Sequence, residues 1–127
     1  MAEQIGSKGA ELDLLIKQGS TFEESCVLQN DDLSFVNLTG CTLRAQMRKN
    51  STSAVAASFS FTITNAAAGA FTFGLTDTQT QALLADMQSE EAYASLYVWD
   101  MELLDSSNKV TPLAYGTVKV FREVTKV

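Results

Sequence analysis

The sequence is dominated by short runs in which apolar and polar residues alternate, and the clearest is CTLRAQMRK at 41–49. Leu43, Ala45 and Met47 fall on one side of an extended chain, and the polar residues between them fall on the other. Because successive side chains of a β-strand point to opposite faces, this period of two predicts a strand with one face in the core. The apolar face of such a strand needs a second layer to cover it, which favours two packed layers.

Comparable runs recur along the chain, separated by stretches rich in Asn, Asp, Ser and Gly, which favour turns. The strands expected from these runs are residues 12–17, 21–29, 41–49, 57–64, 70–76, 92–105 and 110–127. The fourth and fifth of these runs are close enough to form a hairpin. About seven strands, with turns every roughly eight to twelve residues, predict an all-β fold: a two-sheet antiparallel β-sandwich, with an open barrel as the alternative.

The run at 92–105 differs from the others because it contains four consecutive apolar residues, Leu96–Trp99. A strand that is apolar on both faces needs cover on both faces. We therefore expect a central strand that is covered on both sides at this end. The final run contains the only proline, Pro112, near its start, where a missing backbone donor costs least.

One short helix interrupts the β pattern. Thr76 is followed three residues later by Gln79, which matches a capping box, in which each side chain bonds to the backbone of the other residue. The apolar residues that follow at helical spacing are Ala82, Leu83 and Met87. We expect a helix from Asp77 to about residue 87 that connects one sheet to the other, and we assign Thr76 and Gln79 to capping rather than to catalysis.

The domain organisation is simple. Residues 1–10 are polar and contain two glycines, which predicts a flexible N-terminal arm, and residues 11–127 form one sandwich domain. A chain of 127 residues can bury a sufficient core without disulfides. Because Cys26 and Cys41 each lie in an alternating apolar pattern, we expect two buried thiols rather than a disulfide.

The charge of the chain argues against some partners. The net charge is −6 and the nine basic residues are scattered, whereas a nucleic-acid backbone needs clustered Lys and Arg. The tightest basic group, Arg44, Arg48 and Lys49, is expected to be a solvated strand face rather than an anion site. No apolar run approaches the ~18 residues of a membrane span, and the N-terminus lacks the apolar segment of a secretory signal, so we expect synthesis in the cytoplasm.

The residue types that support most catalytic sites are missing. The chain has no histidine, which excludes Ser–His–Asp and Cys–His nucleophiles and imidazole metal sites, and it has no glycine-rich phosphate loop. We therefore expect no catalytic, cofactor-binding or metal-binding residues, and no enzymatic activity. The alternative is a small hydrolase built on Asp100 and Glu102, which share a strand face, or on the adjacent pairs Glu90–Glu91 and Asp31–Asp32.

Two further groups of side chains have a structural and a functional interpretation. The oxygens of Asn30, Asp31 and Asp32 suit calcium, but the run lacks the spacing of a calcium loop, so a turn is favoured. The aromatic residues Tyr93, Tyr97 and Trp99 share one strand face. We favour a place in the core for these aromatics, and the alternative is a platform on which a sugar stacks.

Several motifs occur together in a fixed order. They are QGSTF at 18–22, NLTG at 37–40, AQMR at 45–48, GAFTFGLTDTQT at 69–80, YVWDMEL at 97–103 and YGTVKVFREVT at 115–125. In this order they resemble a family of small immunoglobulin-like structural proteins of tailed bacteriophages. The family includes baseplate-upper-protein N-terminal-like domains, collar and tail-associated proteins, and fibre-attachment modules. The resemblance extends from about Leu12 to near the last residue.

The resemblance implies an immunoglobulin-like antiparallel β-sandwich with one short crossover helix. It implies a non-enzymatic virion structural protein, namely a tail, collar/neck, baseplate or fibre-attachment subunit, assembled in the cytoplasm of the bacterial host. The expected partners are other phage structural proteins in a symmetric homo-oligomeric ring, bound through sheet edges and the N-terminal arm, with no nucleic acid and no membrane. The alternatives are a carbohydrate- or surface-binding β-sandwich module and a capsid decoration protein.

Overall fold

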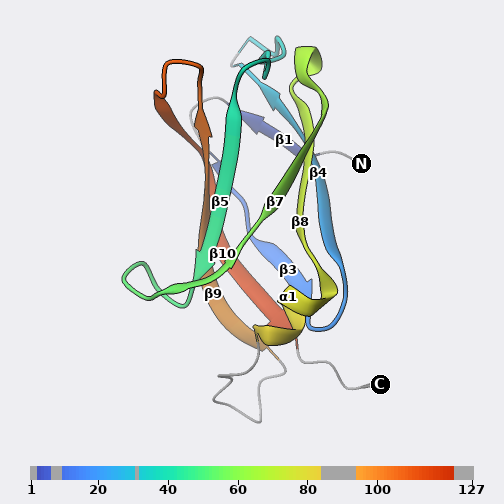
Figure 1. Cartoon of the computed structure of the whole chain (residues 1–127), viewed down its shortest axis with the longest axis vertical. Helices are drawn as coiled ribbons and strands as arrows, with labels where there is room; N and C mark the ends of the chain where they lie inside the picture. The colour runs from blue at the N-terminus through green and yellow to red at the C-terminus, as the bar shows by residue number, and fades with distance from the viewer. Residues whose placement is uncertain (1–2, 7–9, 31, 84–93, 122–127) are drawn as a thin grey trace.

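The computed structural model describes residues 3–6, 10–30, 32–83 and 94–121, which form two β-sheets packed face to face (Figure 1). The four-stranded sheet has the order β1 (Glu3–Gly6), β4 (Phe22–Gln29), β8 (Ala70–Leu75) and β7 (Ser60–Asn65). The six-stranded sheet has the order β2 (Ala10–Glu11), β10 (Val110–Phe121), β9 (Ala94–Leu104), β5 (Thr42–Arg48) and β6 (Val55–Ser58), and β3 (Leu14–Lys17) also pairs with β10. The predicted all-β sandwich is confirmed.

The number of strands exceeds the expected seven, because the described residues contain ten. One reason is the run predicted at 57–64, which is two strands. The chain leaves the six-stranded sheet after β6, passes through the buried Phe59 and enters the four-stranded sheet as β7. The direction of the chain does not reverse at this point, so no turn residues mark the change of sheet. The predicted hairpin between β7 and β8 is present.

The N-terminal segment is the second reason. We expected residues 1–10 to form a flexible arm, whereas Glu3–Gly6 is strand β1, paired in parallel with β4, and Ala10 begins β2. The alternation of side chains gives no signal for such a strand, because its pairing depends on backbone groups that every residue carries. The structure therefore corrects this expectation for residues 3–6 and 10.

The docking of β3 on β10 depends on a close backbone approach. The Trp99 indole N–H donates to the Leu12 carbonyl at 2.7 Å, and the Leu12 N–H donates to the Tyr115 carbonyl at 2.8 Å. A Cβ at Gly116 would lie 2.3 Å from that Leu12 oxygen, so the approach requires glycine. Asp13 completes the contact by accepting from the backbone N–H of Thr117 at 3.0 Å.

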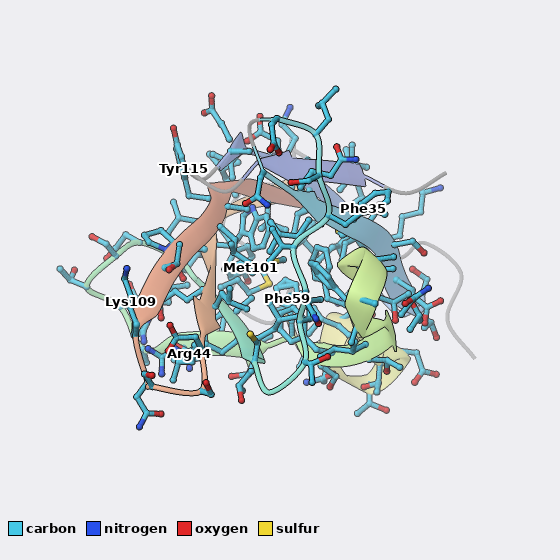
Figure 2. The ribbon with its side chains drawn as sticks, turned by 90° about the horizontal axis from the view of Figure 1, so that it is seen from above. Phe35, Arg44, Phe59, Met101, Lys109 and Tyr115 are labelled. Carbon is cyan, nitrogen blue, oxygen red and sulfur yellow. The ribbon has the colours of Figure 1, made fainter. Side chains whose placement is uncertain are left out.

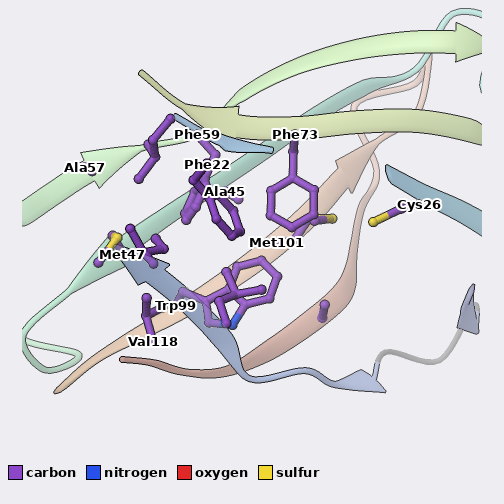
Figure 3. Close-up of a cluster of buried hydrophobic side chains, with 14 of the residues drawn as sticks. Phe22, Cys26, Ala45, Met47, Ala57, Phe59, Phe73, Trp99, Met101 and Val118 are labelled. Atoms are coloured by element: carbon purple, nitrogen blue, oxygen red, sulfur yellow. The ribbon is translucent and has the colours of Figure 1, made fainter. Parts of the chain in front are cut away.

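The core between the sheets is centred on Phe73, on β8 (Figure 3). The Phe73 ring stacks on Trp99 of the opposite sheet, with centroids 5.7 Å apart and 13° between the planes. It also meets Phe22 and Phe59 edge-on, at 6.0 and 5.5 Å. Aromatic pairs at these separations add to the free energy gained from burying the rings. The predicted inward face of β5 is confirmed by the burial of Leu43, Ala45 and Met47, and alternate residues of β4 and β8 are also buried.

The expectation for Leu96–Trp99 is wrong. Tyr97 and Trp99 face the core, but the side chains of Leu96 and Val98 are 55% and 37% exposed. No second layer covers this outer face of β9 in the part of the chain that the structure describes. The strand is central, with β10 and β5 on either side, but only one of its faces is buried.

The predicted helix is present as α1 (Asp77–Ala82), with both hydrogen bonds of the capping box. The Thr76 hydroxyl accepts from the Gln79 N–H at 3.2 Å, and the Gln79 side-chain oxygen accepts from the Thr76 N–H at 2.9 Å. The helix ends about five residues earlier than expected, at Ala82. Residues 84–93, which include Met87, lie outside the described residues. The helix follows a strand of one sheet and precedes a strand of the other, as expected.

Replacing Phe73 by Ala tests the central role of its ring. We expect Phe73→Ala to lower the free energy of unfolding by about 3–5 kcal/mol, because it removes a fully buried ring and leaves a cavity between the sheets. Urea denaturation followed by Trp99 fluorescence measures the change. The control Phe35→Ala makes the same substitution where the ring is 54% exposed, and it should cost less than about 0.5 kcal/mol. Equal losses in the two variants would contradict the proposed centre of the core.

The helix cap gives a second prediction. Thr76→Ala should lower the free energy of unfolding by about 1 kcal/mol, because the backbone N–H of Gln79 loses its acceptor. The exposed Thr78, inside the same helix, provides the control, since Thr78→Ala removes no cap and alanine has the higher helix propensity. Thermal and urea unfolding of the two variants measures the difference, and a loss in Thr78→Ala as large as in Thr76→Ala would contradict the cap.

Candidate functional site

The outer face of the six-stranded sheet carries most of the candidate functional side chains. We use the term outer face for the exposed side of β2, β3, β10, β9 and β5. Cross-strand register places Leu15 beside Lys119 and Lys119 beside Leu96 in one row. The remaining rows are Thr117, Val98 and Arg48; then Glu11, Tyr115, Asp100 and Gln46; then Glu102 and Arg44. The face therefore combines large apolar side chains with both signs of charge.

A hollow of about 350 Å³ lies in the middle of this outer face. Its lining includes the apolar side chain of Val98, the ring of Tyr115, and the polar groups of Gln46, Arg48 and Asp100. Tyr115 is 57% exposed, and Figure 2 shows it at the periphery of the molecule, whereas Met101 and Phe59 lie between the sheets. An aromatic ring beside a carboxylate, an amide and a guanidinium can bind a partner through both apolar contact and hydrogen bonds.

The two carboxylates of β9 lie on this face, as predicted, but in different surroundings. Glu102 accepts from Arg44 Nε at 2.7 Å, in an ion pair exposed to solvent. Burial and then the neighbouring charge of Glu102 raise the pKa of Asp100 above its ordinary 3.8, against the opposing effect of Arg48 and Arg44. A raised pKa beside a second carboxylate also occurs in structural charge networks, so it does not by itself indicate catalysis.

The basic group at the end of β5 is held by contacts within the molecule. Arg48 donates to the Ser53 carbonyl at 2.6 Å and to the Gln46 side-chain oxygen at 3.1 Å. The Lys49 ammonium lies 4.6 Å from the centroid of the Tyr97 ring. The predicted interpretation as a polar strand face fits Arg44 and Arg48, which lie on the outer face.

The aromatic residues expected to share a face do not form an exposed platform. Tyr97 and Trp99 are buried, and the Tyr97 hydroxyl donates to the Leu83 carbonyl. Tyr93 lies outside the described residues. The preferred interpretation as core residues is therefore confirmed for Tyr97 and Trp99, and a sugar platform made from these two rings is wrong.

The oxygen-rich turn after β4 has a structural explanation. Asp32 accepts from the backbone N–H of Ser34 at 3.0 Å and from its hydroxyl at 2.5 Å. These bonds lower the pKa of Asp32, because they favour its charged form. Asn30 also donates to the Ser34 hydroxyl, and Asp31 lies outside the described residues. Within the described residues no group of three acidic, Cys or His side chains is placed to hold a metal ion.

The two thiols lie in different environments. Cys26 is buried on β4, as expected, but Cys41 is only partly buried just before β5. The two residues are not joined by a disulfide.

The sequence interpretation did not identify Leu15 and Tyr115 as members of an apolar surface, and it expected Leu96 and Val98 to be covered. All four occupy positions of their strands where strict alternation calls for a polar residue. A large apolar side chain on the polar side of an alternating strand was therefore the signal that could have identified this face.

Comparison with known proteins adds no assignment. No protein-family model matches the chain, and no curated protein matches it at a significant level. Within the described residues no helix has the length and apolar character needed to cross a membrane.

The pKa of Asp100 predicts a dependence of stability on pH. Because the folded protein binds this proton more tightly than the unfolded chain, the wild type loses stability as the pH rises through the folded pKa of Asp100. Asp100→Asn lacks this loss, so its stability relative to the wild type should improve between about pH 3 and about pH 7. Urea denaturation at a series of pH values measures the difference.

Asp13→Asn is the control with the opposite sign. Hydrogen bonds from Thr117 lower the pKa of Asp13, so its contribution is present above the unfolded pKa and lost as the pH falls through the folded one. This variant should therefore become less stable relative to the wild type as the pH rises. A change in the same direction for both variants would contradict the assigned environments.

Proposed function

We propose that the chain is a non-enzymatic structural protein of a tailed-bacteriophage virion, namely a tail, collar/neck or fibre-attachment subunit that assembles with other virion proteins. The proposal starts from the ordered motifs of the sequence and from a two-sheet sandwich with a capped helix between its sheets. The motif GAFTFGLTDTQT, for example, spans β8 and the start of α1 and includes Phe73 and both capping residues.

The observation that carries the proposal is the outer face of the six-stranded sheet. Leu15, Leu96, Val98 and Tyr115 are large, exposed and placed on neighbouring strands of a single sheet face. Apolar side chains gathered in this way on a soluble domain mark an interaction surface more often than scattered exposed residues do. Tyr and Arg are also enriched where proteins bind one another, and Arg44 and Arg48 border the apolar residues. We therefore assign this face to the contact with a neighbouring virion protein.

Particle composition tests the proposal. Particles released from cells that carry the gene should contain peptides of this chain after density-gradient purification, at the abundance of a structural subunit, when analysed by mass spectrometry. Absence of the chain from purified particles would refute the proposal. Separate analysis of heads and tails then identifies the layer.

A pair of matched variants tests the assigned face. Tyr115→Ala should reduce incorporation into particles roughly tenfold or more, because a large aromatic contact is lost from the middle of the interface. Phe35→Ala removes an aromatic ring of similar exposure, 54% against 57%, from a loop outside this face, and it should be incorporated normally. Equal incorporation of both variants would contradict the role of the outer face.

The second candidate function is a carbohydrate-binding module, and the hollow around Tyr115 favours it. Its ring, the Asp100 carboxylate and the Gln46 amide offer the stacking and hydrogen bonds that a sugar needs. A chain of this kind would bind a glycan array as an isolated protein, and Tyr115→Ala would abolish that binding, whereas a virion subunit need not bind any glycan.

A further inference from the structure

We propose that β7 is a docking edge for a second copy of this chain, which adds its own β7 in antiparallel orientation and joins the two four-stranded sheets into one. This inference does not rest on the virion assignment, because it follows from the edge itself. In Figure 1, β7 crosses the front of the molecule, and among the described residues it pairs with β8 alone. Its other side therefore presents alternate backbone N–H and C=O groups, which an extended strand satisfies.

The edge lacks charge. From Asn50 to Thr76 the sequence has no charged residue, so all nine basic and fifteen acidic residues lie elsewhere. This segment includes the whole of β6 and β7, which are consecutive edge strands of the two sheets. Two copies that each carry a net charge of −6 repel one another, and an uncharged edge is where they approach at the lowest electrostatic cost. Depletion of charge is also the main compositional mark of the centre of protein interfaces.

The opposite side of the molecule provides a contrast. The edge strands β2 and β3 of the six-stranded sheet carry exposed charged residues, Glu11 and Lys17. Charges on an edge strand are a common protection against pairing with another chain. Strand β7 contains no charged residue and no proline that would protect it against pairing with another chain. Its one irregularity is the shift of register with β8 between Ile63 and Asn65. The regular part of the edge is therefore Ser60–Ile63.

The core is also incompletely covered at this edge. Register pairs Phe61 with Phe73 and Ile63 with Phe71, so both side chains of β7 point to the inner side of the sheet. Phe61 is nevertheless only partly buried, and Ile63 is 39% exposed. In the single chain both side chains are partly in contact with solvent. A strand added beside β7 would cover them with its own inward-facing apolar side chains.

The symmetry of such a pair selects the register. In such a dimer the two-fold axis is perpendicular to the continuous sheet, and the inner faces of both copies lie on the same side of it. The axis must then pass midway between one residue and the same residue of the second copy. Centring the axis on Thr62 places Thr62 opposite Thr62 of the second copy, and Phe61 opposite its Ile63. Thr–Thr and aromatic–β-branched neighbours are both favourable cross-strand pairs. This register also uses the part of β7 that precedes the register shift.

Self-association of the purified chain tests the docking edge. Sedimentation velocity over a concentration series up to roughly 1 mM should show reversible formation of a dimer. Ile63→Lys should weaken the dimer at least roughly tenfold, because it inserts a charge between apolar partners. Leu33→Lys introduces the same charge at an exposed residue in the loop that follows β4, outside both β7 and the outer face, and it should leave the dimer intact. A wild type that stays monomeric, or equal weakening by both variants, would overturn the proposal.

Crosslinking tests the register without depending on the lysine variants. Thr62→Cys should form a disulfide-linked dimer with diamide as oxidant, because facing Cα atoms in an antiparallel pair lie within disulfide reach. Ser60→Cys should not, because the two copies of residue 60 are then ~13 Å apart along the strands. The wild type, with Cys26 and Cys41, controls for the native thiols. Crosslinking of Ser60→Cys as efficient as that of Thr62→Cys would overturn the register.

These outcomes are independent of particle composition. A chain found in particles but monomeric as a purified protein would overturn the docking edge and leave the proposed function standing. A chain that dimerises through β7 but is absent from particles would do the reverse.

Discussion

The stacking of Phe73 on Trp99 is the contact on which the rest of the molecule depends. It joins the centre of one sheet to the centre of the other. Phe22 of β4 and Phe59, the residue between β6 and β7, pack around it. The same Trp99 holds the carbonyl of Leu12 through its indole N–H. One side chain thus fixes both the packing of the sheets and the entry of the chain into β3.

The inner faces of both sheets are buried in this core. The surfaces that the two sheets expose to solvent differ strongly from each other. The outer face of the six-stranded sheet has apolar side chains mixed with the Arg44–Glu102 ion pair and other polar groups, which suits a partner with a shaped and partly polar surface. The β7 edge offers uncharged backbone, which suits any extended strand of matching polarity. A protein with both surfaces can contact like and unlike neighbours at the same time, since the surfaces lie on different sheets.

Much of the fold was predictable because a strand with one buried face produces an alternation of apolar and polar residues in the sequence. Leu43, Ala45 and Met47 alternate with polar residues, and the structure buries all three. Thr76 and Gln79 are likewise a local signal, since a capping box needs only residues three positions apart. These features depend on neighbours in the chain, so one sequence suffices to detect them.

The remaining features depend on contacts that leave no local pattern. Pairing of Glu3–Gly6 with β4 uses backbone groups alone, and the passage from β6 to β7 needs no turn residue. Whether Leu96 and Val98 are covered depends on whether another layer exists, which their own strand does not encode. The arrangement of side chains within the candidate site was not predictable for the same reason, because the position of Tyr115 relative to Asp100 follows from the register of β10 with β9.

The parallel pairing of β3 with β10 also has a consequence for synthesis. Asp13 and its partner Thr117 are separated by 104 residues, so the strand that β3 pairs with is synthesised long after β3 itself. Until then Leu14 and Ile16, which the finished protein buries, have no neighbouring strand on which to dock. Leu14 and Ile16 are therefore exposed in the nascent chain for the whole interval between the synthesis of β3 and that of β10.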